Sequence, residues 1–352
     1  MSFKDSLRKF DQYRRKKMMK LEVLLFQVIN NKKIMVDSLI KPEDVEKILI
    51  VRTNKRIGNM FFLLPFLHET RKCYPNAEID LVLNLPWQGK IFENIAINKI
   101  FYSHFSFKDI FKWGECIKEL KKQDYDLVLM PYQSVGDAVT SALMNGRNKA
   151  SFVSDINGIA FPHAVTEDGC ERHFAFKPLK ILEGIGNQLE KPYGYEIILS
   201  DGEVESATTA LRDLSKDSGA RVLAYFRGAR GTKVLSDNVW RGIVAKFKDY
   251  DPENTICVEI LSPDIQTPLE GDTQVYQNAD MRALAAFLAQ CDMFICSDTG
   301  PLHLADAAGA NCVGLFTETD PTVYGCIGAN TVNLTDIEHI DVSAIYSRLG
   351  LK

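Results

Sequence analysis

Four residues near the C-terminal end of the chain have the types and spacing to bind an anion. Asp298, Thr299, Gly300 and His303 follow directly on the apolar run 293–297. A short apolar run predicts a buried parallel strand, and the residues after Gly300 suit a helix. Backbone N–H groups at the start of a helix attract phosphate, and glycine lets an anion approach the backbone closely. The stretch therefore predicts a phosphate-binding turn.

A purely structural role fits the same residues. Asp298 or Thr299 could cap the helix, and His303 could be a half-buried histidine with its own partner. Gly309 would end the helix, and the apolar run 312–316 predicts the next strand of a βαβ unit. In open α/β sheets such turns lie at the carboxyl edge, where ligands bind, so both interpretations stay open.

A second polar loop, 227–233, is rich in glycine and in cations. It follows the apolar run 221–226 and places Thr232 and Lys233 ahead of a predicted helix at 237–247. Glycine frees backbone N–H groups and lysine supplies charge, so the loop suits a diphosphate. The alternative is a solvated basic loop.

Two further residues of this half are candidates for the same ligand. Glu259 lies in a predicted strand at 255–261, from which it could reach the ribose of a nucleoside. Met281 stands just before a predicted helix at 284–291, ahead of the central motif. We count both with the ligand-binding residues.

The order Asp-Thr-Gly-x-x-His-x-Ala-x-Ala-x-Gly from Asp298, followed by Leu-Phe-x-x-Thr-Asp-Pro at 315–321, resembles the donor-site motif of the heptosyltransferase family. These glycosyltransferases use ADP-heptose and build the inner core of bacterial lipopolysaccharide. The resemblance implies inverting transfer of a sugar from a nucleotide-diphosphate donor to a hydroxyl of an anionic glycan or glycolipid, with no cofactor and no catalytic metal. It places the pyrophosphate at Thr299 and Gly300, near Thr232 and Lys233.

The first half of the chain opens in the same manner. A buried strand is predicted at 47–52, a polar loop leads to Gly58, a helix is predicted at 60–73, and a second strand at 78–83. This is a Rossmann-type opening without the GxGxxG pattern, which disfavours a dinucleotide cofactor. The segment also resembles the N-terminal motif of the heptosyltransferases.

The chain departs from the family at one position. Family members usually carry Gly-Asp in this loop, and the Asp is thought to be the general base, but here the pair is Gly58 and Asn59. An amide cannot take a proton near neutral pH. Ser134 follows the predicted strand 125–130, as in the family's acceptor-facing loop, and Asp137 is a candidate substitute base. The simpler interpretation of Asp137 is an acid in the first turn of a helix.

The N-terminal residues form a separate unit. Within residues 1 to about 33, apolar residues recur at helical spacing with lysines and arginines between them. Such a basic amphipathic helix could lie on an anionic membrane surface through residues 1–31, or it could dock on the protein itself. The resemblance implies a cytoplasmic protein, peripheral on the inner membrane.

Composition fits a two-domain globular protein. The 352 residues are 46% hydrophobic and 25% charged, with a net charge of −4 that gives no general attraction to nucleic acid. None of the eight cysteines forms a metal-binding or redox pair by spacing, which favours free thiols in a reducing cytoplasm. We find neither a signal peptide nor an apolar run long enough to span a bilayer.

These observations predict an α/β protein of two Rossmann-like domains facing across a cleft, the glycosyltransferase B (GT-B) architecture. We expect a basic helical extension at 1–45, an acceptor domain at 46–190 and a donor domain at 191–352. A closing helix is predicted at 339–351, which in this architecture often packs back on the first domain. Two alternatives remain: a nucleotide-sugar-binding relative that has lost its base, and a sugar-nucleotide epimerase of similar plan.

Overall fold

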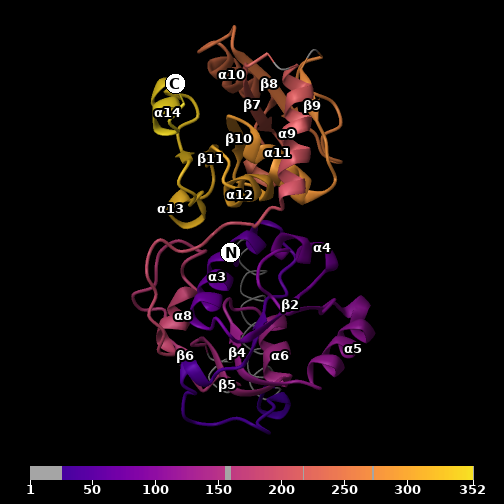
Figure 1. The fold of residues 1–352 in the computed structure, drawn as a ribbon, viewed down its shortest axis with the longest axis vertical. Coiled ribbons are helices and arrows are strands. Elements are labelled where there is room, and N and C mark those ends of the chain that lie inside the picture. The colour runs from indigo at the N-terminus through magenta and orange to yellow at the C-terminus, as the bar shows by residue number, and fades with distance from the viewer. Residues whose placement is uncertain (1–25, 155–159, 217, 272, 352) are drawn as a thin grey trace, which may run out of the picture.

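The computed structural model describes residues 26–154, 160–216, 218–271 and 273–351. Within these ranges the chain forms two six-stranded sheets, whose domains lie end to end in Figure 1. The first sheet has the order β3-β2-β1-β4-β5-β6 and the second β12-β11-β10-β7-β8-β9, with every neighbouring pair parallel. Each is the doubly wound order of a Rossmann-like domain, so the predicted α/β fold is confirmed.

The strands are β1 (Lys47–Val51), β2 (Glu78–Leu83), β3 (Lys99–Tyr102), β4 (Asp124–Met130), β5 (Asn145–Phe152), β6 (His163–Val165), β7 (Arg221–Phe226), β8 (Thr255–Ile260), β9 (Gln274–Tyr276), β10 (Met293–Ser297), β11 (Cys312–Leu315) and β12 (Thr331–Leu334). The α-helices are α2 (Gly58–Phe61), α3 (Leu64–Cys73), α4 (Pro86–Gly89), α5 (Ile110–Leu120), α6 (Val135–Leu143), α8 (Leu179–Gly184), α9 (Asp201–Ser215), α10 (Asp237–Lys248), α11 (Met281–Gln290), α12 (Gly300–Ala307), α13 (Pro321–Tyr324) and α14 (Val342–Arg348). Short 3₁₀ turns are η1 (Pro42–Asp44), η2 (Lys90–Phe92), η3 (Phe107–Asp109) and η4 (Gly231–Lys233).

In each sheet the chain changes direction once, between β1 and β4 and between β7 and β10. Ligands of open α/β sheets bind at such a switch point, outside the carboxyl ends of the strands. In Figure 1, α12 of the second domain faces the first domain near α3 and α4. The loops at the two switch points therefore point toward the same interface.

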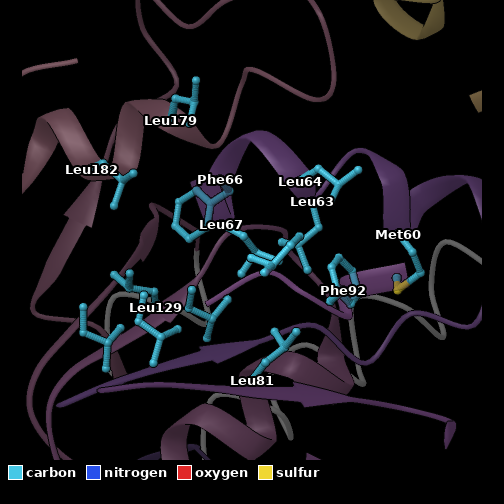
Figure 2. Packing of buried hydrophobic residues seen from close by; sticks show 14 of the residues in the cluster. Met60, Leu63, Leu64, Phe66, Leu67, Leu81, Phe92, Leu129, Leu179 and Leu182 are labelled. Carbon is cyan, nitrogen blue, oxygen red and sulfur yellow. The ribbon is translucent and has the colours of Figure 1, made fainter. Parts of the chain in front are cut away.

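The largest core cluster lies in the first domain and extends into the second. Figure 2 shows Phe66 of α3 and Leu182 of α8 over Leu81 and Leu129 of the sheet. The same cluster includes side chains on the helices of the second domain that face the interface, namely Ala285, Leu304 and Ala307. The two domains thus share continuous apolar packing, which stabilises their association by removing surface from water.

The helix predicted at 60–73 is divided in two. Helix α2 ends at Phe61, and α3 begins at Leu64 with Pro65 in its first turn. Proline lacks the N–H that would continue a helix from the preceding turn, so it suits the start of a new one. The break leaves Phe62 at the corner between the two helices.

The closing helix packs differently from our expectation. Helix α14 buries Ile345 and Tyr346 in a cluster with Leu223 of β7 and Trp240 of α10, within the second domain. The prediction that it returns to the first domain is wrong, because its apolar face finds partners on its own sheet.

The described part of the N-terminal extension docks on the first domain. Phe26 is 1% exposed against Met130, Ala138 and Phe161. The buried Lys149 amine donates to Asn31 O at 3.1 Å and to Ala142 O at 2.9 Å, and burial, with a smaller contribution from Lys121, lowers its pKa to about 7. Residues 26–31 therefore follow the self-docking alternative, whereas residues 1–25 of the predicted membrane-binding helix lie outside the described residues.

No helix among the described residues is long and apolar enough to cross a bilayer. All eight cysteines are free thiols, as their spacing predicted. Burial raises the pKa of Cys296 and Cys312, which keeps these thiols protonated and unreactive at neutral pH.

A polar set of contacts joins the domains at the edge of the shared core. Arg282 of α11 is 4% exposed and donates to Glu203 at 2.5 and 2.8 Å, to Ile198 O at 2.6 Å and to Lys90 O at 3.2 Å. Lys90, in the first domain, also pairs with Asp280 at 2.8 Å. One buried guanidinium therefore links the first domain, the connecting segment and the second domain.

Candidate active site

Asp298 is the centre of the polar cluster at the second switch point. It follows β10 and is 8% exposed. Its carboxylate accepts from the Lys233 amine, from Thr319 Oγ1 at 2.6 Å and from His303 Nε2 at 3.1 Å. Burial opposes ionisation, but the hydrogen bonds from His303, Lys233 and Thr319 outweigh it and hold the pKa of Asp298 well below its usual range.

This cluster brings together two segments that the sequence suggested separately. Lys233 comes from η4, after β7, and its amine also donates to the Asp298 carbonyl at 3.2 Å. Asp298 and His303 come from the turn and helix after β10. A cation and a helix end thus lie side by side at the switch point, the combination that suits a diphosphate.

The start of α12 is left open by its own side chains. Thr299 is the N-cap residue but makes no capping bond, and its hydroxyl lies 3.3 Å from Cys296 Sγ. Pro301 has no N–H, while the N–H groups of Leu302 and His303 turn back to Thr299 O at 3.2 and 3.4 Å. Among the hydrogen bonds of the described residues, none uses the Gly300 N–H, so this donor is free for an anion.

The first domain covers this helix end directly. A Cβ atom at Gly300 would overlap Ile57 Cγ2, and one at Gly58 would lie 3.5 Å from His303 Cδ2. The Phe62 ring meets the His303 ring edge to face, with centroids 4.6 Å apart. The glycine is therefore required in this structure by the neighbouring domain, and an anion reaches its N–H only after Ile57 moves.

Three of the predicted donor-binding residues do not join the cluster. Thr232 is exposed beside Lys233. Glu259 is fully buried, and its oxygens accept from Arg227 Nε at 2.5 Å, Leu269 N at 2.6 Å and Tyr225 OH at 3.1 Å. Met281 packs against the shared core. In this structure Glu259 serves as an internal acceptor for three protein donors, and its contact with a ribose stays a prediction.

On the acceptor side, Asn59 and Ser134 lie at the ends of neighbouring strands of the first sheet. Asn59 is half-buried at the start of α2, and no hydrogen bond of the described residues uses its side chain. Ser134 caps α6 by accepting from Asp137 N at 3.1 Å. Gly58 contacts the second domain through His303, as described above. The loop that carries Gly58 and Asn59 therefore faces the turn and helix that follow β10.

Asp137 is not placed to act as the base. It is fully buried in the first turn of α6, accepts from Thr53 N at 2.6 Å and Thr53 Oγ1 at 2.5 Å, and lies 3.5 Å from Arg52 Nη1. Burial raises its pKa although Arg52 and Thr53 act in the other direction. The structure supports the simpler interpretation of a structural acid, because no acceptor hydroxyl can reach a carboxylate that is closed off in this way.

Sequence reasoning missed the residues that act across the interface. Thr319 lies in the 315–321 segment of the motif but was not singled out, and Ile57 and Phe62 looked like ordinary apolar positions. His173 was also missed: its Nε2 lies 3.1 Å from Gly325 O, and the Phe174 N–H donates to Val323 O at 2.8 Å. Only knowledge of how the domains meet could have identified them.

No group of three or more His, Cys, Asp or Glu side chains within the described residues is arranged to hold a metal ion. The acidic residue nearest the switch point, Asp298, is committed to donors from the protein.

The contact between Gly300 and Ile57 predicts a coupled pair of substitutions. Gly300→Ala places a methyl group against Ile57, so the midpoint of thermal unfolding should fall by a few degrees, equivalent to about 1 kcal/mol. Ile57→Ala removes the obstructing side chain, so the double variant should be more stable than the sum of the single effects by about 1 kcal/mol. Strictly additive effects in calorimetry would contradict the contact.

His173 predicts a loss of stability in mild acid. Burial, with repulsion from His303 and despite the Gly325 hydrogen bond, lowers its pKa from 6.5 to about 4. Between these values the unfolded chain binds a proton that the folded chain refuses, so stability is full above pH 6.5 and falls as the pH drops toward 4. His173→Gln should flatten urea-unfolding stability in this window, whereas the exposed His339→Gln should not. Parallel profiles for the wild type and His173→Gln would refute this assignment.

Part of the chain matches the sequence model of a known protein family. Residues 248–343 match the model of glycosyltransferase family 9 (heptosyltransferase). The chain is 22% identical over 289 residues to lipopolysaccharide heptosyltransferase 3 of Escherichia coli, covering 75% of this chain and 81% of that protein.

Solved structures agree on the fold. The glycosyl transferase family 9 protein of Veillonella parvula has a TM-score of 0.72 at 18% identity, covering 84% of this chain and 88% of its own. The E. coli heptosyltransferase WaaC with ADP has a TM-score of 0.65 at 16% identity, covering 86% and 99%. These findings, with two doubly wound sheets meeting at their switch points, show a GT-B fold in which residues 248–343 match glycosyltransferase family 9, the heptosyltransferase family.

Proposed function

We propose that this glycosyltransferase moves a heptose from ADP-heptose onto a hydroxyl of a lipopolysaccharide-core or related anionic glycan, with inversion. The observation that carries the proposal is the cluster of Lys233, Asp298 and His303 beside the open N–H of Gly300. It is supported by the relatives: one is named a lipopolysaccharide heptosyltransferase, and solved structures of E. coli WaaC contain ADP or ADP-2-deoxy-2-fluoro heptose.

In the proposed reaction the acceptor oxygen attacks the anomeric carbon while its bond to the diphosphate breaks. The leaving diphosphate gains negative charge, which the Lys233 amine and, once Ile57 has moved, the Gly300 N–H would stabilise. Lys233 meets Asp298 in the structure and would share its charge between that carboxylate and the diphosphate. The first domain would present the acceptor through the loop that ends at Gly58 and Asn59.

The chain's own residues also favour a second candidate, a relative that binds a nucleotide sugar without transferring it. Asn59 replaces the family's base, and the nearest candidate substitute, Asp137, is closed off from any acceptor. A transferase without a carboxylate at this point would need the acceptor proton to leave by another route. The two candidates differ in turnover but agree on donor binding.

We also propose that the acceptor domain spans 46–190 and the donor domain 191–352. Helix α8 belongs to the first domain because it packs in the cluster with α3. The connecting segment reaches the second domain by residue 197, whose N–H donates to Ala307 O at 2.9 Å. Limited proteolysis tests this boundary, because cleavage is expected in the segment between α8 and α9.

Donor binding is tested at Lys233. Lys233→Met removes the amine but keeps a chain of similar length, and we expect ADP to bind about tenfold more weakly in calorimetry, about 1.4 kcal/mol. Arg230→Met, an exposed cation of the same loop, is the matched control and should change affinity little. Equal losses in both variants would indicate general attraction to a basic loop in place of a defined site.

The base is tested at Asn59. Asn59→Asp restores a carboxylate at the family's position, and general-base catalysis contributes about 10²–10⁴-fold, so kcat/KM should rise at least about tenfold with a suitable acceptor. The gain should disappear at low pH as the new carboxylate protonates. If neither protein turns over ADP-heptose while both bind it, the binding relative is the correct assignment.

A further inference from the structure

One nitrogen of the buried His303 ring has no hydrogen-bond partner. The side chain lies on α12 and is 3% exposed, and its Nε2 lies 3.1 Å from Asp298 Oδ1. Because the pKa of Asp298 lies well below its usual range, its carboxylate is ionised and can only accept, so the proton of a neutral His303 is on Nε2. Among the described residues, no group pairs with Nδ1. A neutral His303 therefore keeps a basic lone pair at Nδ1.

The second buried histidine of the interface is different. His173 Nε2 lies 3.1 Å from Gly325 O, and its Nδ1 accepts from Ala175 N at 3.2 Å. Both of its nitrogens are engaged, and burial lowers its pKa to about 4, so the ring stays uncharged near neutral pH. Of these two histidines, only His303 has a lone pair that could take a proton.

The His303 ring lies against the acceptor loop of the first domain. A Cβ atom at Gly58 would be 3.5 Å from His303 Cδ2, and the Phe62 ring meets the His303 ring with centroids 4.6 Å apart. Asn59 lies between these two contacts in the sequence. An imidazole of the second domain therefore lies beside the loop in which the family usually carries its carboxylate.

The charges around His303 favour a proton on its ring. Asp298 accepts from His303 at Oδ1 and from the Lys233 amine at Oδ2. On the next turn of α12, burial raises the pKa of Asp306, whereas two backbone N–H groups of the loop after α13 and the charge of His303 act in the other direction. His173 is uncharged near neutral pH and Lys233 is paired with Asp298, so an imidazolium at His303 would be stabilised by carboxylate charge.

We propose that His303 is the general base of this chain, an inference that rests on the transfer reaction proposed above. As the acceptor oxygen bonds to the anomeric carbon, its proton passes to His303 Nδ1, and the diphosphate leaves with the electron pair of the broken C–O bond. Asp298 stabilises the imidazolium at Nε2, and the proton then passes to solvent. The acceptor reaches the ring after the loop of Ile57 and Gly58 withdraws, the same movement that frees the Gly300 N–H.

The kinetic test compares the wild type, His303→Gln, Asn59→Asp and the double variant. Glutamine can still donate to Asp298 but cannot take a proton, so His303→Gln should bind ADP as the wild type does, while its kcat/KM falls by about 10²-fold or more. In the Asn59→Asp background the same substitution should cost less than about threefold, because the new carboxylate takes the proton. Such a rescue is not expected if His303 only holds the interface together.

The pH profile separates the base from a structural histidine. Wild-type kcat/KM should fall in mild acid, where histidine takes up a proton, and Asn59→Asp/His303→Gln should stay active to lower pH, where carboxylates titrate. His173→Gln is the matched control, because it removes the other buried histidine and should keep the fall in mild acid.

A measurement without turnover tests the state of the ring. In protein labelled with [15N]histidine, the signals that His303→Gln removes should show, near pH 8, a proton on Nε2 and none on Nδ1. A proton on Nδ1 overturns the proposal, as does a His303→Gln variant that transfers as fast as the wild type. Transfer by Asn59→Asp and none by the wild type refutes His303 as the base but keeps the proposed reaction. No transfer by either protein refutes the reaction as well.

Discussion

The arrangement of the second switch point depends on one buried carboxylate. Asp298 accepts hydrogen bonds from three separate segments: η4 after β7, helix α12 and the segment before α13. A buried carboxylate without hydrogen-bond donors would lower the stability of the fold, so the three donors are expected to keep their positions around Asp298. Through His303 the same carboxylate also fixes the ring that Phe62 of the first domain contacts. The geometry of the second switch point and the contact with the first domain therefore both depend on Asp298.

The sequence contained most of the fold but only part of the site. Strands such as β1, β7 and β10 are continuous apolar runs, because parallel strands are covered on both faces, and their bounds were predicted closely. The turn at Asp298 and Gly300 could also be predicted, because the residue types that form a turn and start a helix are adjacent in the sequence. The partners of Glu259 could not be predicted, because a carboxylate within a strand pattern carries no sign of the hydrogen bonds that Arg227 and Tyr225 donate.

The contacts between the two domains could not be predicted from sequence patterns. Ile57 and Phe62 are apolar residues near a helix start, and nothing in their spacing says that they meet Gly300 and His303. Gly300 shows the difficulty most clearly. A glycine at the start of a helix is expected where an anion approaches, yet in this structure a neighbouring side chain already takes that space. A glycine at position 300 fits both the approach of an anion and the packing of Ile57, so the sequence alone could not show which of the two requires it.

The two sheets share one strand order, so the β4–α6 turn of the first domain is the counterpart of the β10–α12 turn of the second. Their helix ends have opposite chemistry. Ser134 closes the end of α6 with its own hydroxyl, whereas Thr299 leaves the end of α12 unclosed. A helix end that is satisfied internally gives up its attraction for anions, and one that is not retains it. Two sheets of one strand order have thus acquired different helix ends, and of the two it is the end of α12 whose N-cap hydroxyl makes no capping bond.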